Sequence, residues 1–158
     1  LGLETLNLIA TILLVQFVGI FGAFLFSRLS NKIGNIKTLK ITIVIWGLVC
    51  FIGFNLTKDT PNIEMYFYVL GALIGLVMGA IQSLARSTYS KLLPKTEDTT
   101  SYFSFYAVTE KIALVVGMVT FGILNSLISI QSSVLALAIF FLAAFISISR
   151  IKKTTYVH

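Results

Sequence analysis

The chain has 158 residues, of which 57% are hydrophobic and only 11% are charged, and its mean hydropathy is +0.96. Water-soluble domains carry about a quarter charged residues, so this composition excludes a soluble globule and predicts that most of the surface meets lipid. The net charge of +6 does not indicate nucleic-acid binding, because the basic residues lie in short clusters between apolar stretches, as they do in membrane proteins.

The first part of the chain contains three apolar stretches that are long enough to span a membrane. They are residues 5–26, 39–57 and 65–85, and about 20 helical residues suffice to cross a hydrocarbon core of about 30 Å. The sequence starts with Leu1 in an apolar segment, without an initiator Met or a signal-peptide pattern. We therefore expect it to be a piece of a longer protein.

The last part of the chain contains one apolar stretch that is too long for a single span. No charged residue occurs in 112–149, which is nearly twice the length of one span. The polar residues within 125–133 therefore predict a turn, with one span at 101–124 and another at 131–149. The expected fold class is an all-α, polytopic transmembrane helical bundle with about five spans and the lipid bilayer as its surroundings.

The distribution of basic residues predicts how the spans are oriented. Excess Lys and Arg mark the cytoplasmic side of a membrane protein. They follow the first span, the third span and the fifth span: Arg28, Lys32, Lys37 and Lys40, then Arg86, Lys91 and Lys95, then Arg150, Lys152 and Lys153. The opposite side carries Lys58 together with Glu4, Asp59 and Glu64. We therefore expect an integral membrane protein of a bacterial inner membrane, with the start of the chain outside and its end in the cytoplasm.

Glycines recur every four residues along the third span, at Gly71, Gly75 and Gly79. This spacing forms two overlapping GxxxG patterns on one helix face, where a neighbouring helix can approach to backbone contact. The pattern predicts a tight packing face. The same smooth face is also compatible with a surface along which helices slide or rock during a conformational cycle.

Gln16 and Gln82 are candidate polar residues within apolar spans. Gln16 is near the middle of the first span, about 16 Å along the helix from its start. An amide at that depth needs partners inside the protein, so Gln16 forms either an interhelical hydrogen bond or a substrate contact in a central cavity. Gln82 lies toward the inner end of the third span, where polar residues are more common.

Glu110 and Lys111 are charged residues about 13–15 Å inside the helix that begins near Ser101. A charge in the centre of a membrane helix costs about 2.5–3.5 kcal/mol on insertion scales, so each should face the bundle interior or a water-filled cavity. Adjacent residues point about 100° apart on a helix, so each needs its own partner, and Arg86 has the reach to meet Glu110. The alternatives are a structural ion pair, proton coupling through Glu110, and a substrate-carboxylate anchor at Lys111.

The chain lacks the residues that enzymes and metal sites require. Its one cysteine, Cys50, lies inside an apolar run, and its one histidine, His158, is the last residue. A single thiol forms no intramolecular disulfide and behaves as a small hydrophobe when buried. An integral-membrane enzyme would need clustered His, Cys or carboxylate groups near an interface. We expect no catalytic residues, no metal site and no cofactor.

Residues 27–37, SRLSNKIGNIK, resemble the signature between the second and third helices of each half of major facilitator transporters. In that signature a glycine, here Gly34, permits a tight turn, and an acidic residue caps a neighbouring helix end. Asn31 stands at the acidic position, and Asn35 and Ile36 replace the usual basic pair. The resemblance implies that Asn31 can keep the capping role without the charge.

A closer resemblance runs from Gly75 to Gly117. This stretch is similar to the unknown-major-facilitator group, which is related to the vacuolar amino-acid effluxers of autophagy, and the matching positions are Gln82, Arg86, Ser87, Pro94, Phe105, Tyr106 and Lys111. The segment Val15-Gln16-Phe17 also fits the group. The resemblance implies that the five spans are helices eight to twelve of a twelve-helix transporter, with the N-terminal half as their missing partner.

The same resemblance implies a secondary transporter that moves or effluxes a small solute by alternating access, with amino acids as the candidate substrates and protons as a candidate coupling ion. Gln16, Glu110 and Lys111 are the residues expected to contact the substrate or the coupling ion. The rival hypothesis is a structural membrane subunit without a transport site. It predicts no water-filled cavity, with Glu110 and Lys111 both paired inside the bundle.

Overall fold

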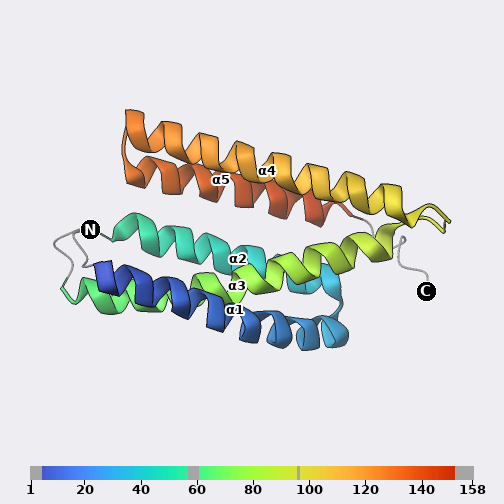
Figure 1. Ribbon diagram of the computed structural model, residues 1–158, viewed down its shortest axis with the longest axis horizontal. Helices are drawn as coiled ribbons and strands as arrows, with labels where there is room; N and C mark the ends of the chain where they lie inside the picture. Colours follow the sequence, from blue (N-terminus) through green and yellow to red (C-terminus); the bar gives the residue numbers. More distant parts are fainter. Residues whose placement is uncertain (1–4, 57–60, 96, 152–158) are drawn as a thin grey trace.

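The computed structural model describes residues 5–56, 61–95 and 97–151. These residues form five helices and no strand: α1 (Thr5–Ile33), α2 (Asn35–Asn55), α3 (Ile63–Leu92), α4 (Thr99–Leu127) and α5 (Ile130–Ser149). Each helix is long and apolar enough to cross a membrane. The expected all-α transmembrane bundle is therefore confirmed (Figure 1).

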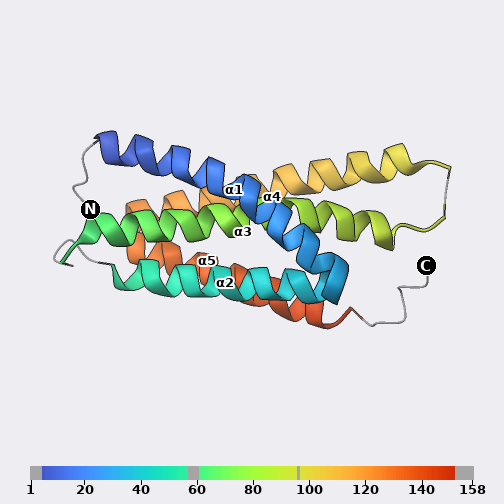
Figure 2. The same ribbon diagram turned by 90° about the horizontal axis from the view of Figure 1, so that it is seen from below.

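The helices lie along one long axis, and α1 crosses over α3 (Figure 2). The most extensive packing is between α1 and α3, whereas α2 packs against α5 and α3, and α4 packs against α5. A small core of Phe26, Leu39, Ala80 and Leu84 joins α1, α2 and α3. Cys50 is buried, as expected. No residue of α4 is buried, which fits a bundle whose outer surface meets lipid or further protein.

The segment 27–37 is helical rather than a loop. Only Gly34 separates α1 from α2, and its φ of 90° lies in the region that favours glycine, so the predicted tight turn is confirmed. The 29 residues of α1 make a helix of about 43 Å, longer than a hydrocarbon core of about 30 Å. Because helices can continue beyond the lipid, Arg28 and Lys32 lie on α1, and Lys37 and Lys40 on α2.

The basic residues after the third span are placed similarly. Arg86 and Lys91 belong to α3, and only Lys95 lies in the connection to α4. At the end of that connection, Asp98 caps α4 by accepting a hydrogen bond from Ser101 N at 3.1 Å. Hydrogen bonds from the side chain and backbone of Ser101 lower the pKa of Asp98, as expected for a carboxylate at a helix N-terminus.

The capping role that the resemblance implies for Asn31 is wrong for α2. Gly34 occupies the N-cap of α2 without a side-chain hydrogen bond, and Asn31 is exposed on α1. Asn35 is buried instead: its Nδ2 donates to Ser87 Oγ at 3.0 Å, and Lys91 Nζ donates to its Oδ1 at 2.9 Å. A neutral amide therefore ties the α1–α2 turn to the end of α3.

The polar cluster near residues 125–133 forms the predicted turn. Ser129 is the N-cap of α5, and its side chain accepts a hydrogen bond from Ser132 N at 3.2 Å. The buried Ser133 hydroxyl donates to the Phe121 carbonyl at 3.1 Å, which joins α5 to α4. Several residues named in the sequence analysis lie outside the described residues. They are Glu4, Lys58, Asp59, Lys152 and Lys153 from the orientation argument, Thr57 at the expected end of the second span, and the single histidine, His158.

Candidate functional site

The glycine face of α3 packs directly on the backbone of α1. A Cβ atom added to Gly75 would lie 2.5 Å from the carbonyl oxygen of Val15, and one added to Gly79 would collide with the Gly19 carbonyl. Gly71 faces the Thr11 side chain, with 2.7 Å to Cγ2. The predicted tight packing is present, and it brings the Gln16 region of α1 alongside α3.

A cavity of about 510 Å³ lies between α1 and α3. Gln16 of α1 and Gln82 of α3 both line it, together with Ser83 and apolar or glycine residues of the two helices. Gln16 is exposed and forms no hydrogen bond with the part of the chain that the structure describes. Its amide therefore stays available to a ligand or to further protein, since an amide in an apolar span needs a partner.

A second cavity, of about 460 Å³, lies between α3 and α4 and is more polar. It is lined by Gln82, Ser83, Arg86, Ser87, Ser90, Phe103 and Glu110. Because Gln82 and Ser83 line both cavities, the two cavities meet along one face of α3. We call this combined surface the polar groove; it runs from Gln16 on α1 past Gln82 to Glu110 on α4.

Arg86 is the partner that the sequence predicts for Glu110. Their Nη2 and Oε2 atoms are 3.6 Å apart, with 64% of the Arg86 side chain and 32% of the Glu110 side chain exposed. The Arg86 guanidinium also lies 6.0 Å from the centre of the Tyr106 ring. An ion pair of this kind can exchange partners with a charged ligand, because the described residues leave both side chains partly uncovered.

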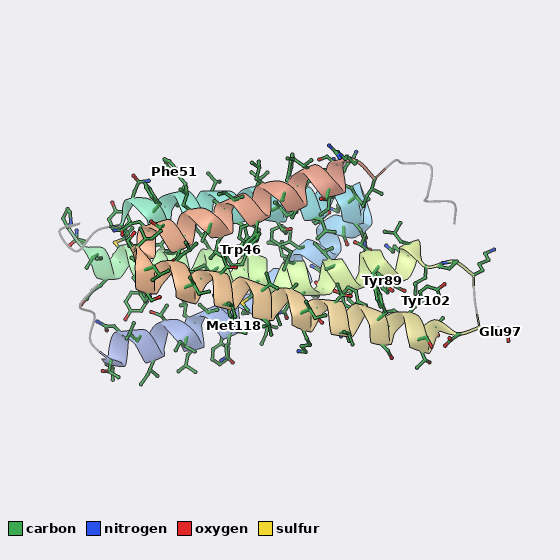
Figure 3. All side chains as sticks on the ribbon, turned by 90° about the horizontal axis from the view of Figure 1, so that it is seen from above. Trp46, Phe51, Tyr89, Glu97, Tyr102 and Met118 are labelled. Carbon is green, nitrogen blue, oxygen red and sulfur yellow. The ribbon has the colours of Figure 1, made fainter. Side chains whose placement is uncertain are left out.

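Aromatic side chains pack together beside the end of the groove nearest the α3–α4 connection, where Phe103 lines it. Tyr89 packs against Tyr106, with 4.8 Å between ring centres, and edge-on against Phe103 at 5.8 Å. The Tyr89 hydroxyl donates to the Tyr102 carbonyl at 2.9 Å, and Figure 3 shows both tyrosines between α3 and α4. This cluster holds the two helices together at that end.

Lys111 lies outside the polar groove. It is exposed on α4, lines neither cavity, and forms no ion pair with any described residue. The 100° step between neighbouring helix positions explains why Glu110 turns toward α3 while Lys111 does not. The structural-subunit hypothesis predicts that Glu110 and Lys111 are both paired and that no cavity is present. Among the described residues, Lys111 has no ion-pair partner, and cavities lie on both sides of Gln82.

The other site residues predicted from the sequence lie either in the polar groove or at the α1–α2 turn. Asn31 and Gly34 line neither cavity and belong to the α1–α2 turn. Sequence reasoning missed Ser83, Ser87 and Ser90 as groove residues. Their spacing of four and three places them on the helix face that carries Gln82 and Arg86, so the 3.6-residue period of α3 was the available signal.

Comparison with known proteins relates the chain to transporters. Residues 1–155 match the family described as vacuole effluxer Atg22 like. The chain is 24% identical over 156 residues to an uncharacterized MFS-type transporter, YxiO, of Bacillus subtilis, which covers 98% of this chain and 35% of that protein. It is 30% identical over 118 residues to autophagy-related protein 22-1 of Penicillium rubens, covering 69% of this chain and 20% of that protein. No solved structure shows a significant match.

Proposed function

Because the chain belongs to the family described as vacuole effluxer Atg22 like, we propose that it is part of a secondary active transporter that moves a small solute by alternating access. The chain spans about a third or less of the length of these relatives, so the rest of the protein would supply the other side of the pathway. The observation that carries the proposal is the polar groove, which places amides, hydroxyls and an ion pair on helices that are otherwise apolar.

The proposed substrate is an amino acid. The α3–α4 cavity holds a guanidinium and a carboxylate 3.6 Å apart, with serine hydroxyls beside them. A zwitterionic substrate would displace Glu110 from Arg86 and place its own carboxylate on the Arg86 fork. The glutamines at Gln16 and Gln82 supply neutral donors and acceptors for the remaining polar atoms. The name of the family supports efflux as the direction of transport.

The proposed coupling ion is the proton, and Glu110 is the group proposed to carry it. Among the described residues, Glu110 is the one carboxylate that lines the polar groove. Protonation would remove the charge that Arg86 faces and release its guanidinium toward the substrate. Proton binding at Glu110 and substrate binding at Arg86 would then be coupled.

The orientation proposed from the sequence agrees with the clustering of basic residues at one end of the bundle. The α1–α2 turn, the α3–α4 connection and the end of α5 lie together at the right of Figure 1, and they carry Lys37, Lys95 and Arg150. We propose that this end is cytoplasmic. The match to YxiO covers almost the whole chain, which supports a bacterial cell membrane as its location.

Transport by the complete protein in proteoliposomes tests this proposal. Vesicles loaded with one unlabelled amino acid at a time should exchange it for the labelled form outside, and the protein should prefer some amino acids over others. Vesicles without protein give the background. If none of the twenty amino acids exchanges above background, the proposed substrate class is wrong. Exchange of another solute in that case would still support the proposal that the protein is a transporter.

A further inference from the structure

An apolar groove separate from the transport pathway lies between α2 and α5. It has a volume of about 270 Å³ and is lined by Val44 and Gly47 of α2 with Ala138, Phe141, Leu142 and Phe145 of α5. Figure 2 shows α2 and α5 side by side along one side of the bundle, whereas α1 crosses α3 on the other. The groove and the cavity between α1 and α3 therefore share no lining residue and no helix.

One end of this apolar groove is basic. Lys40 Nζ lies 6.0 Å from the centre of the Phe145 ring, and Lys40 precedes Val44 and Gly47 by four and seven residues, which places all three on one face of α2. Lys37 lies one turn before Lys40, and Arg150 follows the last residue of α5 at the same end of the bundle. The groove thus combines an apolar body with a positively charged mouth.

The wall of the groove is supported from behind. The Trp46 ring stacks on Phe141 with 5.0 Å between ring centres and an interplanar angle of 12°, and Trp46 does not itself line the groove. The Phe141 ring is therefore held in place by packing. A cavity whose walls are already ordered binds its ligand with a smaller loss of side-chain entropy.

The lining and the charge of the groove point to its occupant. Its body is apolar, as an acyl chain requires, and one end carries Lys40, which attracts an anion. Its body offers no polar group to a hydrophilic solute. We propose that the groove binds an anionic phospholipid, with one acyl chain between α2 and α5 and the headgroup phosphate on Lys40.

The experiment compares lipid binding to the complete protein in detergent, with phosphatidylglycerol and phosphatidylcholine of the same acyl chains as probes and native mass spectrometry as the readout. The parent should retain phosphatidylglycerol in preference. Lys40→Gln should weaken that preference about fivefold, whereas Lys95→Gln, in the exposed α3–α4 connection, should leave it unchanged. Equal retention of both lipids by the parent, or an unchanged preference in Lys40→Gln, would overturn the proposal.

A second pair of variants tests the acyl-chain site. A Cβ atom added to Gly47 or to Gly117 meets nothing within 4 Å, so both positions accept a side chain without a backbone clash. Gly47→Leu should fill the groove and reduce retention of both lipids, whereas Gly117→Leu on α4 should not. A photo-crosslinking residue at Val44 should capture lipid; capture of another part of the protein, or full lipid retention in Gly47→Leu, would exclude the assigned site.

Discussion

Arg86 on α3 and Glu110 on α4 face each other across the polar groove, with 3.6 Å between Nη2 and Oε2 and both side chains partly exposed. Exposed ion pairs contribute only about 0–1 kcal/mol to stability. Changes to this pair should therefore alter transport more than they alter folding, which separates a functional pair from a structural one.

Glu110→Gln should fold normally and lose accumulation driven by a pH gradient, while exchange of substrate persists. Glutamine keeps the size and hydrogen bonding of the side chain but cannot titrate, and exchange returns the carrier loaded, so it needs no proton release. The measurement is uptake into proteoliposomes with and without an imposed pH gradient. Normal pH-driven accumulation in Glu110→Gln would assign the coupling elsewhere.

Arg86→Gln should raise the half-saturation concentration for amino acids about tenfold or more, because a charged hydrogen bond contributes about 1.5–3 kcal/mol. The initial rate of exchange against substrate concentration gives this value. Arg28→Gln is the matched control, since Arg28 is an exposed arginine of α1 that lies outside the groove.

Lys111→Gln separates the two candidate anchors for a substrate carboxylate. Lys111 lies outside the polar groove. The half-saturation concentration of Lys111→Gln for amino acids should therefore stay near that of the parent protein. A large increase in Lys111→Gln together with a normal value in Arg86→Gln would reverse the assignment made from the structure.

Gly75→Leu should lower the thermal stability and the folded yield of the complete protein in detergent. The new Cβ would lie 2.5 Å from the backbone carbonyl of Val15, and backbone cannot move aside as a flexible side chain can; overpacking of this kind costs about 1–3 kcal/mol or more. Gly117→Leu, which meets open space, is the control. Equal melting temperatures for the two variants would show that α1 and α3 do not pack here.

Asn35→Ala should destabilise the protein by about 1–3 kcal/mol, because it leaves Ser87 without its donor and Lys91 without its acceptor in a part-buried site. Asn31→Ala should change the stability by only a few tenths of a kcal/mol, since Asn31 is exposed. Thermal unfolding of both variants checks the comparison. A larger loss in Asn31→Ala would restore the role that the family resemblance implies for that residue.

Cysteine labelling tests the orientation of the bundle. Single cysteines at Lys37 and Lys95 should react with an impermeant reagent only from the cytoplasmic side, and one at Glu64 only from outside. Glu64 is exposed near the start of α3, at the opposite end of the bundle. Cys50 is buried and should be replaced with alanine beforehand. The reverse labelling pattern would contradict the proposed topology.

Features that depend on spacing along one helix could be predicted from the sequence. The five apolar lengths, the turn near Ser129, the need for glycine at Gly34 and the packing face at Gly75 each follow from helix length, helix period or backbone conformation. The pairing of Arg86 with Glu110 was also predictable, because a charged residue inside a membrane helix needs a partner and few opposite charges were within reach.

Other features were decided only by the tertiary structure. Periodicity does not say toward which neighbour a helix turns, so the joining of two cavities at Gln82 and the exclusion of Lys111 from the groove emerged only once α3 and α4 were placed. The same cause explains why Asn35, and not Asn31, forms hydrogen bonds to α3. Its partners, Ser87 and Lys91, lie more than fifty residues away in sequence, and helix packing alone brings them within hydrogen-bonding distance.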